Sequence, residues 1–356
     1  MTAASVPAPA TGPDAGAVWH YGDPLGEQRT AAESVVVVNR SHRAVLTLTG
    51  SDRLSWLHTI STQHVSGLPD GAVTENLNLD GQGRIEDHWL QTQLDGVTVL
   101  DTEASRAEPL LAYLTRMVFR ADVRVEVSDL KVLSLLGPRA ADVVQSVLDV
   151  TPPAPWCAVP LPGGGFVRTL DAGEVDVVTP AANVDDVHER LVAAGARPAG
   201  MWVYEAHRVA GLQPRLGVDT DDRTIPHEVR WIGGPGEHGA VHLDKGCYRG
   251  QETVARVHNL GKPPRHLVLL HLDGSADGRP ETGDAVTADG RSVGRIGTIV
   301  DHFELGPVAL ALVKRTITPE TPLVVGPCAA AIDPDSIPKD DGVQAGRQAV
   351  ERLRGR

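Results

Sequence analysis

The chain has 356 residues, of which 41% are hydrophobic, and its formal net charge is -13. This length predicts two or three domains, and the hydrophobic content is sufficient for packed cores. The negative charge disfavours general binding to nucleic acid, while a local basic pocket for a small anion stays open. The three cysteines are far apart and form no C-x-x-C pair, which argues against a disulfide framework and a structural zinc site.

Residues 1–30 are rich in Pro, Ala and Gly and are predicted to form a flexible arm. The first residues include neither a basic start nor an apolar segment, so we expect no secretory signal. We also find no apolar run near the length that spans a bilayer. Together with the sparse cysteines, these features favour the reducing cytoplasm.

Residues 31–130 are predicted to form a first α+β domain. A run of valines at 35–39 indicates a buried strand, and an alternating stretch follows it. Apolar residues then recur at helical spacing, which predicts an amphipathic helix; they are Leu54, Leu57 and Ile60. Two strands flanking the turn GQGR, a second helix and a closing strand complete the domain.

Residues 131–264 are predicted to form a second α+β domain, which includes the segment KGCYRGQE. Its elements run strand, helix, strand, strand, helix, and the strands GFVRTL and EVDVVTP are expected to pair across the turn DAGE. This order is typical of an α+β sandwich, in which helices cover one face of an antiparallel sheet. Short strands with frequent turns predict a β-barrel over residues 265–333. Residues 334–356 are interpreted as a solvated tail.

The stretch DKGCYRGQETVARVHNLG contains the cysteine with the most unusual surroundings, Cys247. A free cysteine is commonly a small buried hydrophobe. However, Lys245 and Arg249 lie within two positions of it, and nearby cations stabilise a thiolate. Gly246 and Gly250 permit tight turns and a close approach of the backbone. One thiol cannot complete a four-ligand metal site, so burial and reactivity both stay open.

Two carboxylates are further candidates. Asp87 follows the Gly-rich turn and could accept N–H bonds from a heterocycle in a pocket, or it could be an exposed charge at the end of a strand. The adjacent Glu86 should face the other way on a strand, so only one of the two would serve a pocket. Glu228 is the last residue of TIPHE, after a turn set by proline, and ordinary loop polarity is the alternative explanation. The histidines lack the H-E-x-x-H spacing of a zinc protease.

KGCYRGQE resembles the signature K-G-C-Y-x-G-Q-E of the YgfZ family, and the following TVARVHNLG matches as well. GSDRLSWLHTISTQHV, DGQGRIED and RTIPHE are similar to further segments of that family, so the resemblance covers most of the chain between residues 30 and 334. YgfZ proteins belong to a superfamily that includes the aminomethyltransferase, or T-protein, of the glycine cleavage system. The resemblance implies three domains, two α+β units and a barrel, in a ring around a central channel.

The resemblance also implies a function. YgfZ proteins bind tetrahydrofolate and take part in the assembly or repair of iron–sulfur clusters, so the expected partners are client iron–sulfur proteins and cluster carriers. Cys247 becomes the reactive thiol, or a transient ligand of a 4Fe-4S cluster, and no resident metal is expected. Asp87 matches the T-protein aspartate that contacts folate. The residues expected around the cofactor are Asp87, Glu228, Lys245, Tyr248, Arg249, Gln251, Glu252 and Arg256.

Two departures from the T-protein limit this reading. Val209 stands where the T-protein has a glutamate that holds the pterin, so folate is held differently or more weakly. The T-protein typically has Asp at the position of Cys247 and a basic residue at that of Gln251, which argues against aminomethyl transfer. We therefore expect an accessory factor rather than a conventional enzyme. A tetrahydrofolate-dependent aminomethyltransferase or demethylase and a folate-independent docking module are the alternatives.

Overall fold

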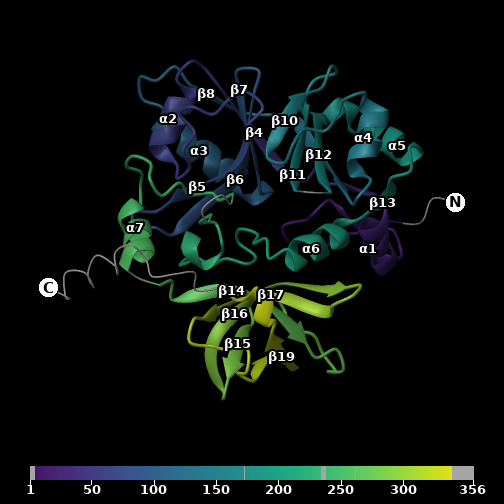
Figure 1. Cartoon of the computed structure of the whole chain (residues 1–356), viewed down its shortest axis with the longest axis vertical. Coiled ribbons are helices and arrows are strands. Elements are labelled where there is room, and N and C mark those ends of the chain that lie inside the picture. The colour runs from purple at the N-terminus through teal and green to yellow at the C-terminus, as the bar shows by residue number, and fades with distance from the viewer. Residues whose placement is uncertain (1–4, 172, 234–237, 261, 339–356) are drawn as a thin grey trace. The chain divides into compact units, whose positions relative to one another are not determined.

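A computed structural model describes residues 5–171, 173–233, 238–260 and 262–338 (Figure 1). The chain groups into two compact units. The first contains the residues up to Ile60, His64–Asn76 and His88–Ala206; the second contains Ser61–Gln63, Leu77–Asp87 and the residues from His207 onward. Neither predicted boundary, near residue 130 or residue 264, coincides with this division, and the three-domain division stays a prediction.

A five-stranded sheet is built around the first predicted α+β pattern. Its strand order is β5-β6-β7-β4-β8. The strands are β4 (Ala44–Thr49), β5 (Val73–Leu79), β6 (Ile85–Leu94), β7 (Val97–Thr102) and β8 (Arg124–Val127). Apolar side chains of α2 (Arg53–Ile60) and α3 (Ala107–Met117) pack in one core with Leu46, Leu48 and Leu100 of this sheet. The helix predicted from Leu54, Leu57 and Ile60 is confirmed as α2.

A six-stranded sheet, ordered β10-β11-β12-β9-β3-β13, lies in the first unit. Its strands are β3 (Val36–Asn39), β9 (Leu130–Leu136), β10 (Cys157–Pro160), β11 (Phe166–Asp171), β12 (Glu174–Pro180) and β13 (Arg197–Ala199). The predicted pairing of the strands on either side of the turn DAGE is confirmed, because β11 and β12 are antiparallel neighbours. The placement of 35–39 in the first α+β domain is wrong: Val36 of β3 pairs with Leu136 of β9.

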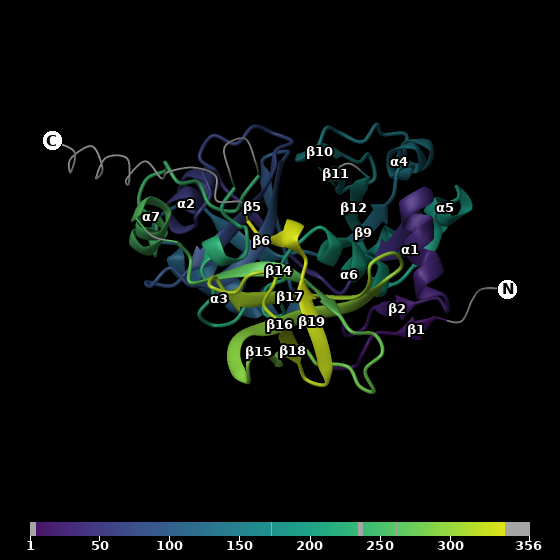
Figure 2. The ribbon, with the colours of Figure 1, turned by 60° about the horizontal axis from the view of Figure 1, so that its bottom comes forward.

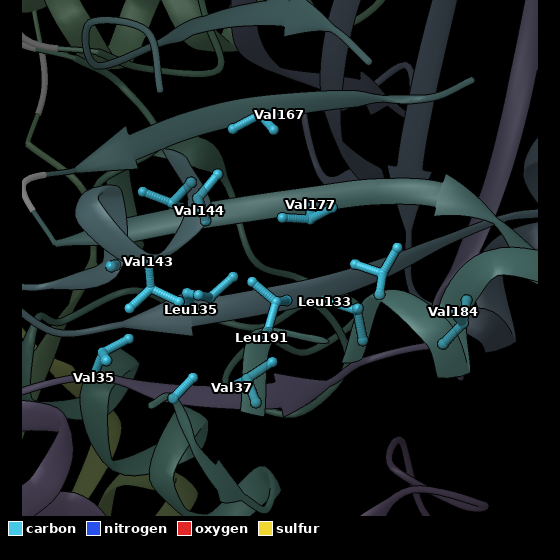
Figure 3. Packing of buried hydrophobic residues seen from close by; sticks show 14 residues of the cluster. Val35, Val37, Leu133, Leu135, Val143, Val144, Val167, Val177, Val184 and Leu191 are labelled. Atoms are coloured by element: carbon cyan, nitrogen blue, oxygen red, sulfur yellow. The ribbon is translucent and has the colours of Figure 1, made fainter. Parts of the chain in front are cut away.

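Apolar residues fill both sides of β3, which explains its central place in this sheet. Val36, Val37 and Val38 are all buried. Val37 belongs to the core beneath α4 (Ala140–Leu148) and α5 (Val184–Ala193), while Val36 and Val38 face a second cluster. Figure 3 shows the first of these cores, where side chains from the strands meet Val143 and Val144 of α4 and Leu191 of α5.

The prediction of a flexible arm is wrong for residues 5–30. The segment forms β1 (Val6–Pro7), β2 (Val18–His20) and α1 (Pro24–Glu33). Asp23 caps α1 by accepting a bond from Gly26 N at 3.0 Å, and Pro24 occupies the first turn, where its fixed φ suits a helix start. Buried Glu27 accepts from Gly200 N at 3.0 Å and thereby ties α1 to the end of β13. In the sequence, the pair Asp23-Pro24 was the available signal for the start of helix α1.

A group of buried charges joins strands of the two sheets inside this unit. Arg168 of β11 is fully buried, and its guanidinium contacts Asp176 at 2.7 Å and Asp101 at 2.5 Å. Arg43 contacts Asp101 at 2.5 Å and Glu103 at 2.7 Å. Burial alone would raise the pKa of Asp101, but Arg43 and Arg168 hold that pKa well below its usual range. The two sheets therefore share a network of buried ion pairs.

The predicted C-terminal β-barrel is confirmed. Six strands close in the order β14-β17-β16-β15-β18-β19 (Figure 2). They are β14 (Arg265–Leu272), β15 (Ala285–Ala288), β16 (Arg291–His302), β17 (Gly306–Lys314), β18 (Leu323–Val325) and β19 (Cys328–Ile332). Most of the predicted tail, from residue 339, lies outside the described residues. Within the described part of the chain, no helix has both the length and the apolar character needed to cross a membrane.

Candidate functional site

Three stretches of the second unit come together around the segment KGCYRGQE: residues 61–63, 77–87 and 244–254. Backbone bonds align the first two, because Thr62 N donates to Leu77 O at 3.1 Å. The hydroxyl of Thr62 then donates to Ala240 O at 2.6 Å, just before the third stretch. The third stretch continues into α7 (Gln251–Leu260). The sequence motifs DGQGRIED and KGCYRGQE thus meet at one place.

Two glycines interlock where the turn DGQGR meets α7. Gly83 and Gly250 both have positive φ, 81° and 84°. A Cβ on Gly250 would lie 2.7 Å from Asp80 O and 2.9 Å from Gly83 Cα, and a Cβ on Gly83 would lie 2.8 Å from Thr253 Cβ. Backbone atoms cannot move aside as a flexible side chain can, so these two positions require glycine for both conformation and space.

Gly250→Ala is expected to lower the free energy of unfolding of this unit by about 2 kcal/mol or more, because it combines strained φ with a backbone overlap. The matched control is Gly246→Ala in the same loop, where an added Cβ has no neighbour within 4 Å. That control should change stability by less than about 0.5 kcal/mol. Urea unfolding of the two variants measures the difference, and equal stability would show that the interlock carries no energetic weight.

Lys245 anchors the loop. Its ammonium donates to Ser61 O at 2.6 Å and to Gln63 O at 3.0 Å, and lies 5.2 Å from the centre of the Tyr248 ring. Burial lowers the pKa of Lys245 to about 8 and raises that of Tyr248 to about 12. Gln251, the first residue of α7, donates from Nε2 to Lys245 O at 3.2 Å. These contacts fix the loop on both sides of Cys247.

A chain of hydrogen bonds leads from the loop to Asp87. Arg249 Nη1 lies 2.8 Å from Glu86 Oε2. Asn78 Nδ2 donates to the same Glu86 oxygen at 3.2 Å and to Asp87 Oδ2 at 3.1 Å. Glu86 is half-buried and Asp87 is buried, as alternation along a strand predicts. The Asn78 amide nevertheless reaches both carboxylates, and the expectation that only one of the two serves a pocket stays a prediction.

Cys247 is exposed, in the loop four positions before the first residue of α7. The buried-hydrophobe reading of this cysteine is therefore wrong. The cationic groups of Lys245 and Arg249 are engaged by carbonyls and by Glu86, and their predicted effect on the thiolate stays a prediction. Glu252 and Arg256 lie exposed on α7. In the described ranges no three His, Cys, Asp or Glu side chains gather as a metal site.

Glu228 takes its contacts from residues outside this chain of hydrogen bonds. It is buried, and Arg265 Nε contacts its Oε1 at 2.8 Å while Ile225 N donates to its Oε2 at 3.1 Å. Arg265 also contacts Asp221 at 2.5 Å. These contacts fasten the segment TIPHE to the first strand of the barrel, so the carboxylate is occupied by a structural role. Its expected role in cofactor binding stays a prediction.

Asn78, Ser61 and Gln63 were not identified from the sequence. The available signal for Asn78 was a polar side chain inside VTENLNL, a strand whose other residues are largely buried. Ser61 and Gln63 act through backbone carbonyls, which carry no signal in the identity of the residue. Val209, at the position where the T-protein has glutamate, is fully buried in α6 (Met201–Ala210).

Comparison with known proteins agrees with this fold. Residues 21–156 match the family model described as the GCVT N-terminal domain. The chain is 28% identical over 312 residues to the tRNA-modifying protein YgfZ of Vibrio vulnificus. This match covers 83% of this chain and 89% of that protein. It is 25% identical over 328 residues to an aminomethyltransferase of Chlorobium phaeovibrioides, across 86% of each.

Among solved structures, the aminomethyltransferase T of the glycine cleavage system from Bartonella henselae has the same fold. The TM-score is 0.78 over 90% of this chain and 91% of that chain, at 18% sequence identity. The chain therefore resembles the GCVT N-terminal domain over residues 21–156 and has the fold of an aminomethyltransferase. Its relatives include the proteins named YgfZ, so the resemblance predicted from KGCYRGQE is confirmed. These similarities support a folate-related function.

Proposed function

We propose that this protein binds tetrahydrofolate and acts as an accessory factor in the assembly or repair of 4Fe-4S clusters in client enzymes. One observation carries the proposal: an exposed thiol, Cys247, stands in a loop that Arg249 and Glu86 connect to the buried Asp87. The residues present fit a pterin, since Asp87 is a buried acceptor and the neighbouring Asn78 Oδ1 is buried without a hydrogen-bond partner among the described residues.

Each residue has a role in this proposal. Asp87 would accept N–H bonds from the pterin, and the folate would supply a one-carbon or redox-active ring near the thiol loop. Lys245 and Tyr248 hold that loop in place, and Gln251 fixes its exit into α7. Exposed Arg256 would attract the anionic tail of the folate by charge, and Glu252 would lie beside it on the same helix. Cys247 would act as a nucleophile or a transient iron ligand, which requires its thiolate form.

The partners we propose are client iron–sulfur proteins and cluster carriers. The names of the YgfZ relatives describe them as tRNA-modifying. A net charge of -13 repels a phosphate backbone, so we propose that this chain contacts protein clients and no nucleic acid. The similarity to aminomethyltransferases favours a second function, aminomethyl transfer to tetrahydrofolate. Incubation with tetrahydrofolate and an aminomethylated lipoyl carrier tests it, and formation of methylene-tetrahydrofolate with release of ammonia would support it against our proposal.

Calorimetry with tetrahydrofolate under anaerobic conditions tests the proposed cofactor. The wild type should bind, and Asp87→Asn should weaken binding roughly 10- to 100-fold, because a hydrogen bond to a charged acceptor contributes about 1.5–3 kcal/mol. Asp289→Asn, in an exposed turn of the barrel, is the matched control and should bind as the wild type does. No binding by the wild type would exclude the cofactor, and equal binding by Asp87→Asn would exclude this residue.

A further inference from the structure

We propose that Asn78 is a second residue that recognises the pterin directly, through its side-chain carbonyl. This inference rests on the proposed function. The orientation of the Asn78 amide is fixed by chemistry: Nδ2 lies 3.2 Å from Glu86 Oε2 and 3.1 Å from Asp87 Oδ2. Both are carboxylate oxygens, which accept and do not donate. A flipped amide would place oxygen against both of them, so the donor end faces the carboxylates.

The carbonyl oxygen of the Asn78 amide, Oδ1, is the end that does not contact the two carboxylates. Asn78 is 2% exposed, and its Oδ1 has no hydrogen-bond partner within the part of the chain that the structure describes. A buried acceptor without a donor costs about 1–3 kcal/mol, and native proteins leave few such groups. Bonds from Nδ2 to two carboxylates hold the amide still, so Oδ1 keeps one direction.

The chemistry of a reduced pterin supplies donors of the right kind. One edge of its ring carries a cyclic amide N–H and an exocyclic amine, and further ring nitrogens carry hydrogen after reduction. The Asp87 carboxylate and the Asn78 carbonyl are two acceptors within one hydrogen-bonded group. Val209, by contrast, gives no acceptor at the position where the T-protein has glutamate.

Asn78 could also act only by holding Asp87 in place, and a double-mutant cycle separates the two roles. Tetrahydrofolate affinity is measured by anaerobic calorimetry for the wild type, Asn78→Leu, Asp87→Asn and the double variant. Direct recognition predicts that Asn78→Leu weakens binding about 5- to 10-fold, the value of one hydrogen bond, and does so again in the Asp87→Asn background. If Asn78 only positions Asp87, adding Asn78→Leu to the Asp87→Asn variant should leave the affinity for tetrahydrofolate almost unchanged.

The outcomes are distinct. If the wild type does not bind tetrahydrofolate, the proposed function fails and this inference fails with it. If the wild type binds and Asn78→Leu changes affinity in neither background, or in the wild-type background alone, only the inference is overturned. Asn78→Thr, which suits a strand and has no carbonyl, gives the same test if Asn78→Leu does not fold. Thermal unfolding of each variant shows that the protein measured is folded.

Discussion

Cys247→Ser is expected to abolish the proposed support of 4Fe-4S enzymes, with the melting temperature unchanged within about 2 °C. The fold should tolerate the change because Cys247 is exposed and serine has nearly the same shape. The chemistry should not tolerate it, because a hydroxyl forms no thiolate at neutral pH and is a poor ligand for iron. The measurement is the activity of 4Fe-4S enzymes in extracts of cells that carry only the variant gene.

Cys157→Ser is the matched control. Cys157 is a free cysteine of intermediate exposure in β10, in the other compact unit. It should support the 4Fe-4S enzymes as the wild type does. Full enzyme activity with Cys247→Ser would remove the thiol from the mechanism, whereas a loss with both variants would point to a general requirement for cysteine that is not specific to the loop.

Arg168→Met is expected to lower the free energy of unfolding by about 3–5 kcal/mol, the usual cost of removing one partner from a buried ion pair. Methionine fills most of the volume, so the loss is electrostatic: Asp101 and Asp176 would remain buried with one cation fewer. Arg43 and Arg40 would still lie near them, which limits the damage. Urea unfolding at pH 7 measures the change.

The control for this variant is Arg190→Met, which removes an exposed pair with Asp186 on α5 and should cost less than about 0.5 kcal/mol. The pH dependence gives a second check. The pKa of Asp101 is depressed in the folded protein, so its stabilisation is present above the ordinary pKa of an aspartate and is lost as the pH falls below it. Arg168→Met should therefore flatten the loss of stability in acid. Equal stability of both variants would contradict the role of the cluster.

The parts of the fold that the sequence predicted are those set by local patterns. The hairpin of β11 and β12 follows from two short apolar runs and a Gly-containing turn between them. The strand at residues 35–39 was predicted as an element but not with its partner, because a run of valines indicates burial on both faces without naming the neighbouring strand. Pairing of β3 with β9 joins segments almost a hundred residues apart.

The candidate site was also predicted only in the parts that local sequence patterns determine. The motif around Cys247 and the carboxylate Asp87 were found from residue types at fixed spacing. The contacts of Lys245 and Arg249 were not predicted, because nearness in sequence says little about the direction of a long side chain. Lys245 reaches the carbonyls of Ser61 and Gln63, and Arg249 reaches Glu86. Asn78 was missed because its proposed role depends on which end of its amide has no hydrogen-bond partner among the described residues, and this depends on the folded structure.

The hydrogen bond between Arg249 and Glu86 spans 163 positions of the chain, and this affects how the protein is made. At ordinary translation speeds of about 5–20 residues per second, the strand β6 carrying Glu86 and Asp87 leaves the ribosome on the order of 10–30 s before Arg249 exists. A nascent chain that stops before α7 has the carboxylate but lacks the Cys247 loop and the Gly250 that receives the turn. Only a chain synthesised through α7 can form the contact between Arg249 and Glu86 and seat Gly250 against the turn at Gly83.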